Sequence, residues 1–203
     1  PETAGILEGE GYTTKTFDAG YQYFMVVNSK ENETLSDLKL RQAINVAINR
    51  EDMVTALKGG RGANGFFAQY YSFAGDVEEK YDPDEAKSLL EEAGYTDTDG
   101  DGFVDKDGEK LSFTLTAPVD DEVRVNIGTY LSSEWKKLGV DCTLSALGWD
   151  AIDITKCESF LLGWGSPFDA DDHTYKVFGT DKGANYSGYS NEKVDEYLTS
   201  TLL

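Results

Sequence analysis

Apolar residues alternate with polar ones in some stretches of this chain and recur at helical spacing in others. Residues 21–27 place large side chains alternately on the two faces of an extended segment, which predicts a strand covered on both sides. Alternating or continuous apolar positions at 111–115, 140–144 and 159–163 predict three more strands. Because helical segments separate these strands, we expect an α/β domain with a largely parallel or mixed sheet, in which ligands bind at the carboxyl ends of strands.

Apolar residues at helical spacing predict the elements between the strands. The best-marked helix has Asp82 as its N-cap and Pro83 at the first helical position, and it ends before Gly94. We expect Ser36 to cap an earlier helix. The stretch 61–76 is rich in glycine and aromatic residues and lacks a period, so it predicts a long ordered loop over the surface. The other expected helices cover residues 36–48, 50–58, 127–138, 149–154, 171–178 and 194–203.

The composition narrows the class of protein. The 203 residues include 18 Lys and Arg against 38 Asp and Glu, a formal net charge of −20. Nucleic acids and anionic membranes are held by basic side chains, so this charge excludes both as electrostatic partners. With 39% hydrophobic residues the chain is able to bury one substantial core. It contains no apolar run of about 18 residues, so we expect no membrane span.

Both ends of the sequence suggest a piece of a larger protein. The first ten residues, PETAGILEGE, have neither the basic nor the apolar region of a signal peptide. The last ten read as an amphipathic helix without a stop signal. We therefore expect an excised fragment whose leader lies elsewhere.

One acidic segment has part of a calcium-binding pattern. Position 12 of the pattern, which requires a bidentate Glu, is occupied by Gly108, and a strand follows where an EF-hand has a second helix. The segment therefore predicts a tight Asp/Gly turn before a hairpin, with a weak calcium site as the alternative. The aspartates at positions 1, 3, 5 and 9 are Asp97, Asp99, Asp101 and Asp105.

Residues for catalysis are sparse. The single histidine, His173, has no serine in a nucleophile-elbow context, since Ser166 lies seven residues away. No phosphate-binding loop, dinucleotide fingerprint, HExxH or CxxC motif is present, so we expect a protein that is not an enzyme and has no cofactor. Cys142 and Cys157 are too few for a disulfide scaffold, and the sequence leaves open whether they are bridged.

The segment 160–172 has the pattern of a ligand-binding strand end. A short apolar run opens into a loop that contains glycines, Trp164 and Pro167. This arrangement places an aromatic wall and free backbone groups at the carboxyl end of a strand, which suits ligand capture. The alternative is that Trp164 is simply a core residue.

Six stretches resemble, in order and spacing, the family 5 extracellular solute-binding proteins, the oligopeptide, dipeptide and nickel receptors of ABC importers. Two features are specific for this family when found together: the helix that contains Arg41-Gln42-Ala43 and the DPxxAKxLLxxAG pattern. The stretches are YQYFMVVN (21–28), DLKLRQAINVAINRE (37–51), YDPDEAKSLLEEAGY (81–95), WKKLGV (135–140), FLLGWGSPFDADD (160–172) and NYSGYSNEKVDEYL (185–198).

The resemblance implies a two-lobed clamp of the type II periplasmic-binding-protein class that closes on a ligand between its lobes. Residues 1–203 would be most of the second lobe, with the first lobe and the closing C-terminal segment absent. It also implies an extracytoplasmic, lipid-anchored receptor that delivers a peptide ligand to the permease of an ABC importer. The acidic calcium-binding module remains the alternative from another class.

The resemblance also implies a ligand site around Trp164. Backbone groups of the surrounding strand and loop would bind an extended peptide, much as they would bind an added strand. In many members an aspartate three residues after this Trp neutralises the peptide's amino terminus, and here that position is Pro167. Asp169 is the expected substitute. Asp171 and Asp172 are poorer candidates, because they are also placed to cap the helix that carries His173. The ligand-binding residues expected are Trp164, Gly165, Ser166, Phe168, Asp169, Asp171, Asp172 and His173.

Two departures from the family pattern leave the class of cargo open. Dipeptide receptors hold a free carboxylate with an arginine before the long helix, but residues 118–122 contain none. The nearest, Arg124, has the spacing of a helix residue rather than of a ligand clamp. Asn49 replaces a common Asp, a change that we interpret as structural. The alternative cargo is nickel or a metallophore complex, with His173 or Arg124 holding an anionic chelate.

Overall fold

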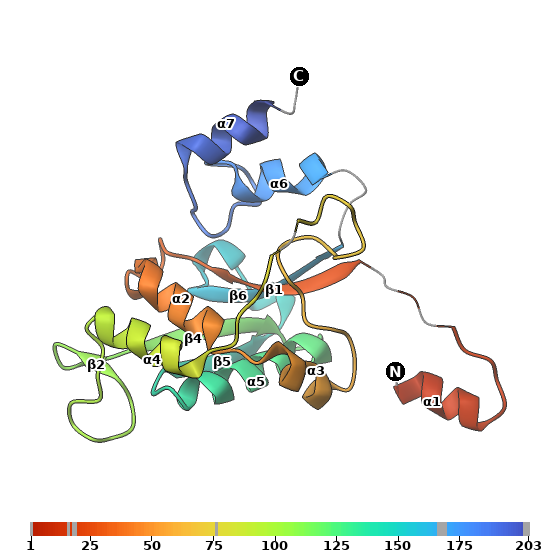
Figure 1. Ribbon diagram of the computed structural model, residues 1–203, viewed down its shortest axis with the longest axis horizontal. Helices are drawn as coiled ribbons and strands as arrows, with labels where there is room; N and C mark the ends of the chain where they lie inside the picture. The colour runs from red at the N-terminus through yellow and green to blue at the C-terminus, as the bar shows by residue number, and fades with distance from the viewer. Residues whose placement is uncertain (1, 16, 18–19, 76, 166–169, 201–203) are drawn as a thin grey trace.

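The computed structural model describes residues 2–15, 17, 20–75, 77–165 and 170–200 as a mixed four-stranded sheet with helices on its faces (Figure 1). The sheet strands are β1 (Tyr21–Val27), β4 (Ser112–Pro118), β5 (Asp141–Leu147) and β6 (Ser159–Gly165), and a separate hairpin contains β2 (Asp105–Lys106) and β3 (Glu109–Lys110). The helices are α1 (Glu2–Gly9), α2 (Leu38–Val46), α3 (Arg50–Leu57), α4 (Pro83–Glu92), α5 (Glu122–Lys136), α6 (Ala170–Phe178) and α7 (Glu192–Ser200). Three short 3-10 turns are η1 (Thr34–Ser36), η2 (Trp149–Ala151) and η3 (Ile154–Lys156).

The sheet has the strand order β1-β6-β4-β5. Strand β4 runs parallel to both β5 and β6, whereas β1 is antiparallel to β6, with Tyr21 opposite Gly165. This topology confirms the predicted mixed α/β sheet. The carboxyl ends of β4, β5 and β6 and the start of β1 lie along one side, here called the carboxyl edge, marked by Tyr21, Pro118, Leu147 and Gly165.

The helices lie on both sides of the sheet. Helices α2, α4 and α5 lie on one side of it in Figure 1, and α6 and α7 lie on the other. Helix α1 stands apart from the sheet in the same view. Within the described ranges, no helix is both long enough and apolar enough to cross a lipid bilayer.

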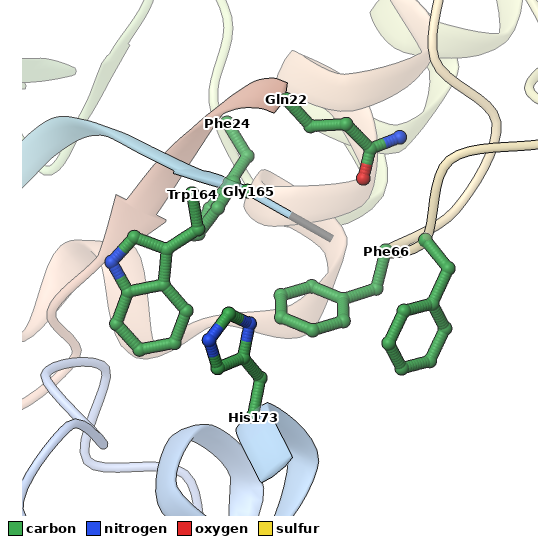
Figure 2. Close-up of a pocket in the computed structure, with 7 residues that line it drawn as sticks. Gln22, Phe24, Phe66, Trp164, Gly165 and His173 are labelled. Carbon is green, nitrogen blue, oxygen red and sulfur yellow. The ribbon is translucent and has the colours of Figure 1, made fainter. Parts of the chain in front are cut away.

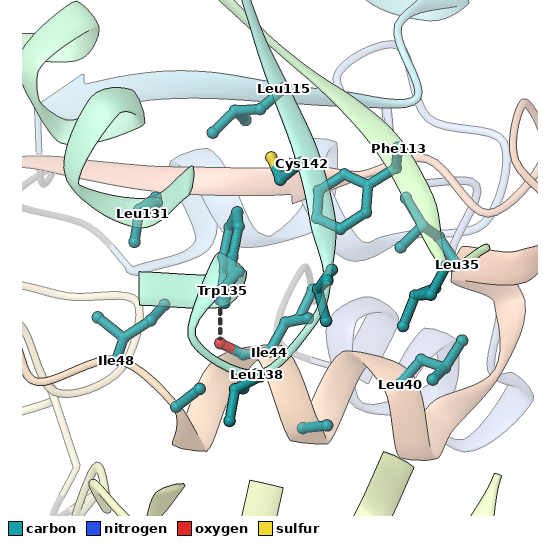
Figure 3. Packing of buried hydrophobic residues seen from close by; sticks show 14 of the residues in the cluster. Leu35, Leu40, Ile44, Ile48, Phe113, Leu115, Leu131, Trp135, Leu138 and Cys142 are labelled. Atoms are coloured by element: carbon teal, nitrogen blue, oxygen red, sulfur yellow. Dashed lines mark hydrogen bonds between the residues drawn. The ribbon is translucent and has the colours of Figure 1, made fainter. Parts of the chain in front are cut away.

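The core lies between the sheet and helices α2, α4 and α5 (Figure 3). Trp135 of α5 is fully buried, and its ring lies 5.5 Å from that of Phe113 on β4. Its indole N–H donates to the carbonyl of Ile44 near the end of α2, at 2.8 Å. That carbonyl needs an outside donor because the N–H of Ile48, which would continue the helix ladder, donates to Asn45 instead.

Side-chain caps mark the starts of α3 and α4. The side chain of Asp82 accepts from the backbone N–H of Glu85 at 2.9 Å, which confirms the predicted start of α4. The side chain of Asn49 accepts from the N–H of Asp52 at 3.1 Å, so this residue has the structural role that we expected. An aspartate at that position would accept the same bond.

Two local predictions are wrong. Ser36 does not cap α2, because it ends η1, and Asp37 caps the helix by accepting from the N–H of Lys39 at 2.8 Å. The helix expected over 149–154 is replaced by the two turns η2 and η3. Ile152 between them has extended dihedral angles, which interrupt any continuous helix.

The two cysteines are free. Cys142 is buried beneath α5, and burial raises the pKa of its thiol to about 11. Cys142 and Cys157 are therefore not bridged, a point that the sequence left open.

We predict that Trp135→Phe lowers the free energy of unfolding by about 2–4 kcal/mol, because the core loses volume and the carbonyl of Ile44 loses its donor. Urea titration followed by circular dichroism measures this change. The control is Trp149→Phe, since that ring is 50% exposed and we expect a loss below about 1 kcal/mol. Equal losses in the two variants would contradict the role given to the indole hydrogen bond.

Candidate functional site

A small pocket opens at the carboxyl edge, on the face of the sheet that points away from the core (Figure 2). Its walls come from β1, β6, α6 and the loop 61–75, and aromatic side chains dominate them. The lining residues are Gln22, Phe24, Phe66, Phe67, Trp164, Gly165 and His173.

The pairing of β1 with β6 builds the floor of this pocket. Gln22 is paired with Trp164, and Phe24 lies one repeat further along the same face of β1. The rings of Phe24 and Trp164 meet edge to face, with their centroids 6.5 Å apart. Trp164 is half-buried. The alternative that it is an ordinary core residue is therefore not supported, because its ring faces a pocket at the end of the strand.

The glycine-rich loop 61–75 supplies the second wall. The ring of Phe66 lies 5.7 Å from that of Phe24 and 4.9 Å from that of Phe178 on α6, in edge-to-face arrangements. Phe67 packs against Phe66 at 5.1 Å. These contacts confirm the prediction of a long ordered loop: its aromatic rings pack against one another and, through Phe66, against β1 and α6.

Helix α6 closes the third side. The imidazole of His173 lies 4.7 Å from the indole of Trp164, and Figure 2 shows both rings converging with Phe66 on the same space. The structure thus brings together three predicted site residues, Trp164, Gly165 and His173. Asp171 is half-buried on the same helix, which also includes Asp172. Ser166, Phe168 and Asp169 lie outside the described residues.

On the opposite face of β1, a buried arginine lies beneath the carboxyl edge. Arg124, on the first turn of α5, is only 6% exposed. Its Nη2 donates to the hydroxyl of Tyr21 at 3.0 Å. The guanidinium carbon lies 5.9 Å from the ring of Tyr23 and 5.7 Å from that of Trp149. The prediction of a helix residue is confirmed, but the sequence did not indicate this burial.

Arg124 retains hydrogen-bonding capacity. Its Nε lies 3.2 Å from a carboxylate oxygen of Asp121 without the geometry of a hydrogen bond, and Nε and Nη1 have no hydrogen-bond partner among the described residues. A buried donor without an acceptor is unfavourable. Burial raises the pKa of the neighbouring Tyr23, and the charge of Asp121 adds to this effect, whereas Arg124 opposes it. The Tyr23 side chain is therefore a neutral hydroxyl, which adds no negative charge beside Arg124.

The acidic segment forms the predicted turn and hairpin. Carboxylate oxygens of Asp97, Asp99 and Asp105 lie within 4.8 Å of one another, but Asp101 forms an ion pair with Lys110. Backbone N–H groups of the turn donate to the first three aspartates of the pattern at 2.8–3.1 Å. The carboxylates therefore hold the turn itself, which favours our preferred interpretation over the calcium alternative.

Sequence reasoning missed four lining residues: Gln22, Phe24, Phe66 and Phe67. Phe24 was expected only to cover a face of its strand, and the two loop residues only to pack on the surface. The available signal was the clustering of aromatic residues in a loop with no period of its own. The contact between that loop and the strands depends on tertiary structure, which the local pattern does not contain.

Comparison with known proteins places this chain among solute-binding proteins. The model of a family described as bacterial extracellular solute-binding proteins, family 5 Middle, matches residues 2–186. The oligopeptide-binding protein AppA of Bacillus subtilis is 29% identical over 196 residues, which are 89% of this chain and 36% of that protein.

Two solved structures have the same fold. AppA from Bacillus subtilis in complex with a nonapeptide gives a TM-score of 0.80 at 31% identity, over 90% of this chain and 38% of that one. NikZ from Campylobacter jejuni in complex with Ni(L-His) gives 0.78 at 34% identity, over 90% and 41%. The chain thus spans less than half the length of each of these proteins.

We predict that Asp99→Asn leaves the melting temperature unchanged, with and without added calcium, because the amide oxygen accepts the same N–H of Asp101. Differential scanning calorimetry measures the effect. The calcium alternative predicts the opposite result: calcium raises the melting temperature of the unmodified protein, and the double substitution Asp97→Asn with Asp99→Asn removes that rise.

Proposed function

The chain belongs to the family 5 bacterial extracellular solute-binding proteins, and we propose that it is most of the second lobe of a receptor for peptides. In this proposal residues 1–203 close on the ligand together with a first lobe, and the loaded receptor delivers the peptide to the permease of an ABC importer. The family consists of solute-binding proteins and is not an enzyme family. The proposed role is accordingly binding and release.

One observation carries the proposal: the aromatic pocket lies at the end of two paired strands, where β6 terminates and β1 begins. Strand ends offer backbone donors and acceptors, which are the same in every peptide. A receptor that binds through them accepts varied sequences, while aromatic walls add affinity without demanding one side chain. The half-buried Trp164 stands at the end of β6, one residue before its last.

We propose that Trp164, Gly165 and His173 contact the ligand directly. Ser166 and Phe168 follow Gly165 in the sequence and are proposed to contact it as well. For the peptide's amino terminus we propose Asp169 as the neutralising carboxylate, with Asp171 and Asp172 as secondary candidates. These assignments rest on the family pattern and on the position of Trp164 and Gly165 at the end of β6.

We further propose that the complete receptor acts outside the membrane and that a lipid anchor holds it there. The description of the family as extracellular supports the location. The anchor is proposed from the family resemblance alone. The partner permease is proposed by class, as the membrane component of an ABC importer.

A second candidate cargo is an anionic metal chelate. Arg124 supports this alternative, because its buried guanidinium has two nitrogens without hydrogen-bond partners among the described residues. An anionic group placed against it would satisfy these donors. The likeness to NikZ, whose structure contains Ni(L-His), supports a metal chelate as cargo. The same geometry also suits the free carboxylate of a peptide, so we retain peptides as the first candidate.

Native mass spectrometry of the full-length receptor, purified without denaturation, tests the proposal. We expect a ladder of added masses that fragments into amino acids, because a closed clamp retains its cargo. A single added mass with a metal isotope pattern would support the chelate instead and would direct attention to Arg124 and His173. A ladder that does not contain amino acids would contradict both candidates.

We predict that Trp164→Ala in the full-length receptor weakens peptide binding about tenfold or more, because a half-buried aromatic wall loses its contact area. Isothermal titration calorimetry measures the affinity, and thermal melting measures the stability of the same variant. We expect only a small change in melting temperature. A fall in melting temperature as large as that of Trp135→Phe would assign Trp164 to the core instead.

A further inference from the structure

We propose that the pocket between Phe24, Phe66 and Trp164 is a subsite for one large apolar side chain of the ligand, and that Phe66 determines its specificity. This inference rests on the proposed function as a peptide receptor. It goes further by naming a class of preferred peptide, one that carries an aromatic or large aliphatic residue at a single fixed position.

The chemistry of the walls selects against charged side chains. The chain has a formal net charge of −20, yet no carboxylate, ammonium or guanidinium group lies among the described residues that line the pocket. The polar lining groups are the amide of Gln22 and the imidazole of His173. A ligand carboxylate placed there would lose hydration without gaining a cation, whereas an apolar side chain gains contact with several rings.

The pocket is too small for a side chain unless one of its walls moves, and Phe66 is the wall that we expect to move. The free volume is about 10 Å³, which accommodates about one water molecule. Phe24 and Trp164 belong to paired strands, so the hydrogen bonds of the sheet fix their backbones. Phe66 instead belongs to the loop 61–75 and is held by edge-to-face contacts with other rings. Phe67 lines the pocket from the same loop, but Phe66 is the ring that packs against Phe24, so a side chain that enters beside Phe24 displaces Phe66 first.

The expected energetic effect is moderate. Burying one aromatic or large aliphatic side chain contributes about 1.5–3 kcal/mol before the ring is displaced, which corresponds to roughly tenfold or more in affinity. Such a gain adds a preference at one position to a receptor that otherwise binds the main chain of the peptide.

The test uses alanine peptides of the length that the full-length receptor retains in native mass spectrometry. Each peptide carries a single Phe, Glu or Lys at one position, and calorimetry compares its affinity with that of the all-alanine peptide. For the unmodified receptor we expect one position at which Phe binds about tenfold tighter than Ala and Glu binds more weakly. No gain from Phe at any position would overturn the subsite but leave the peptide receptor intact. No binding by any of these peptides would contradict the proposed function itself.

A charge variant and its matched control test the assignment to Phe66. Phe66→Glu is expected to abolish the gain from Phe at that position, measured against the all-alanine peptide on the same variant, and to favour Lys there. The control Tyr70→Glu introduces the same charge in the same loop, at a residue that is 48% exposed and does not line the pocket. We expect it to preserve the preference for Phe. An equal shift in both variants would indicate a general charge effect and overturn the assignment.

A second, milder variant covers the case in which Phe66→Glu fails to fold. Phe66→Leu keeps the loop packing apolar but removes the ring, so we expect the gain from Phe, measured against the all-alanine peptide on the same variant, to fall about threefold. A gain that is unchanged in Phe66→Leu would show that Phe66 does not contact the bound side chain.

Discussion

The hydrogen bond from the indole of Trp135 to the carbonyl of Ile44 joins the two parts of the core on which the rest of the structure depends. Two of the last carbonyls of helix α2 accept hydrogen bonds from donors in other elements. Trp135 supplies one, and the backbone N–H of Asp82 supplies another to Val46 at 2.8 Å. Helices α5 and α4 are thereby fixed against α2, and the sheet that packs on them presents its carboxyl edge in one defined orientation.

At that edge, the two faces of strand β1 contribute to two different features. Alternate residues of β1 point to opposite faces, so Tyr21 and Tyr23 lie beside the buried guanidinium of Arg124, while Gln22 and Phe24 line the aromatic pocket. A shift of one residue in the pairing with β6 would exchange the two sets. The register of this one pair of strands therefore controls both the apolar and the cationic features of the edge.

The sequence predicted what local signals specify. The cap at Asp82 predicted the start of α4, and alternating residues predicted the strands of the mixed sheet. The apolar run that ends at Trp164 predicted one wall of the pocket. Prediction failed where the outcome depends on tertiary contacts. Ser36 and Asp37 are both good caps, and a 3-10 turn before α2 decides between them. Phe66 has no periodic context, so its place against Phe24 follows only from the folded sheet.

The pairing of β1 with β6 also has a consequence for the order of folding. Strands β4 and β5 are joined through α5, a short connection that closes at low entropic cost. Strand β1 instead pairs with β6, the last of the described strands along the chain, and contacts between such distant segments form slowly. We expect β4, α5 and β5 to assemble before the edge strand β1 docks. Because β1 supplies half of the pocket floor, the pocket is complete only once that strand has docked, and it is the first feature to be lost when the strand detaches.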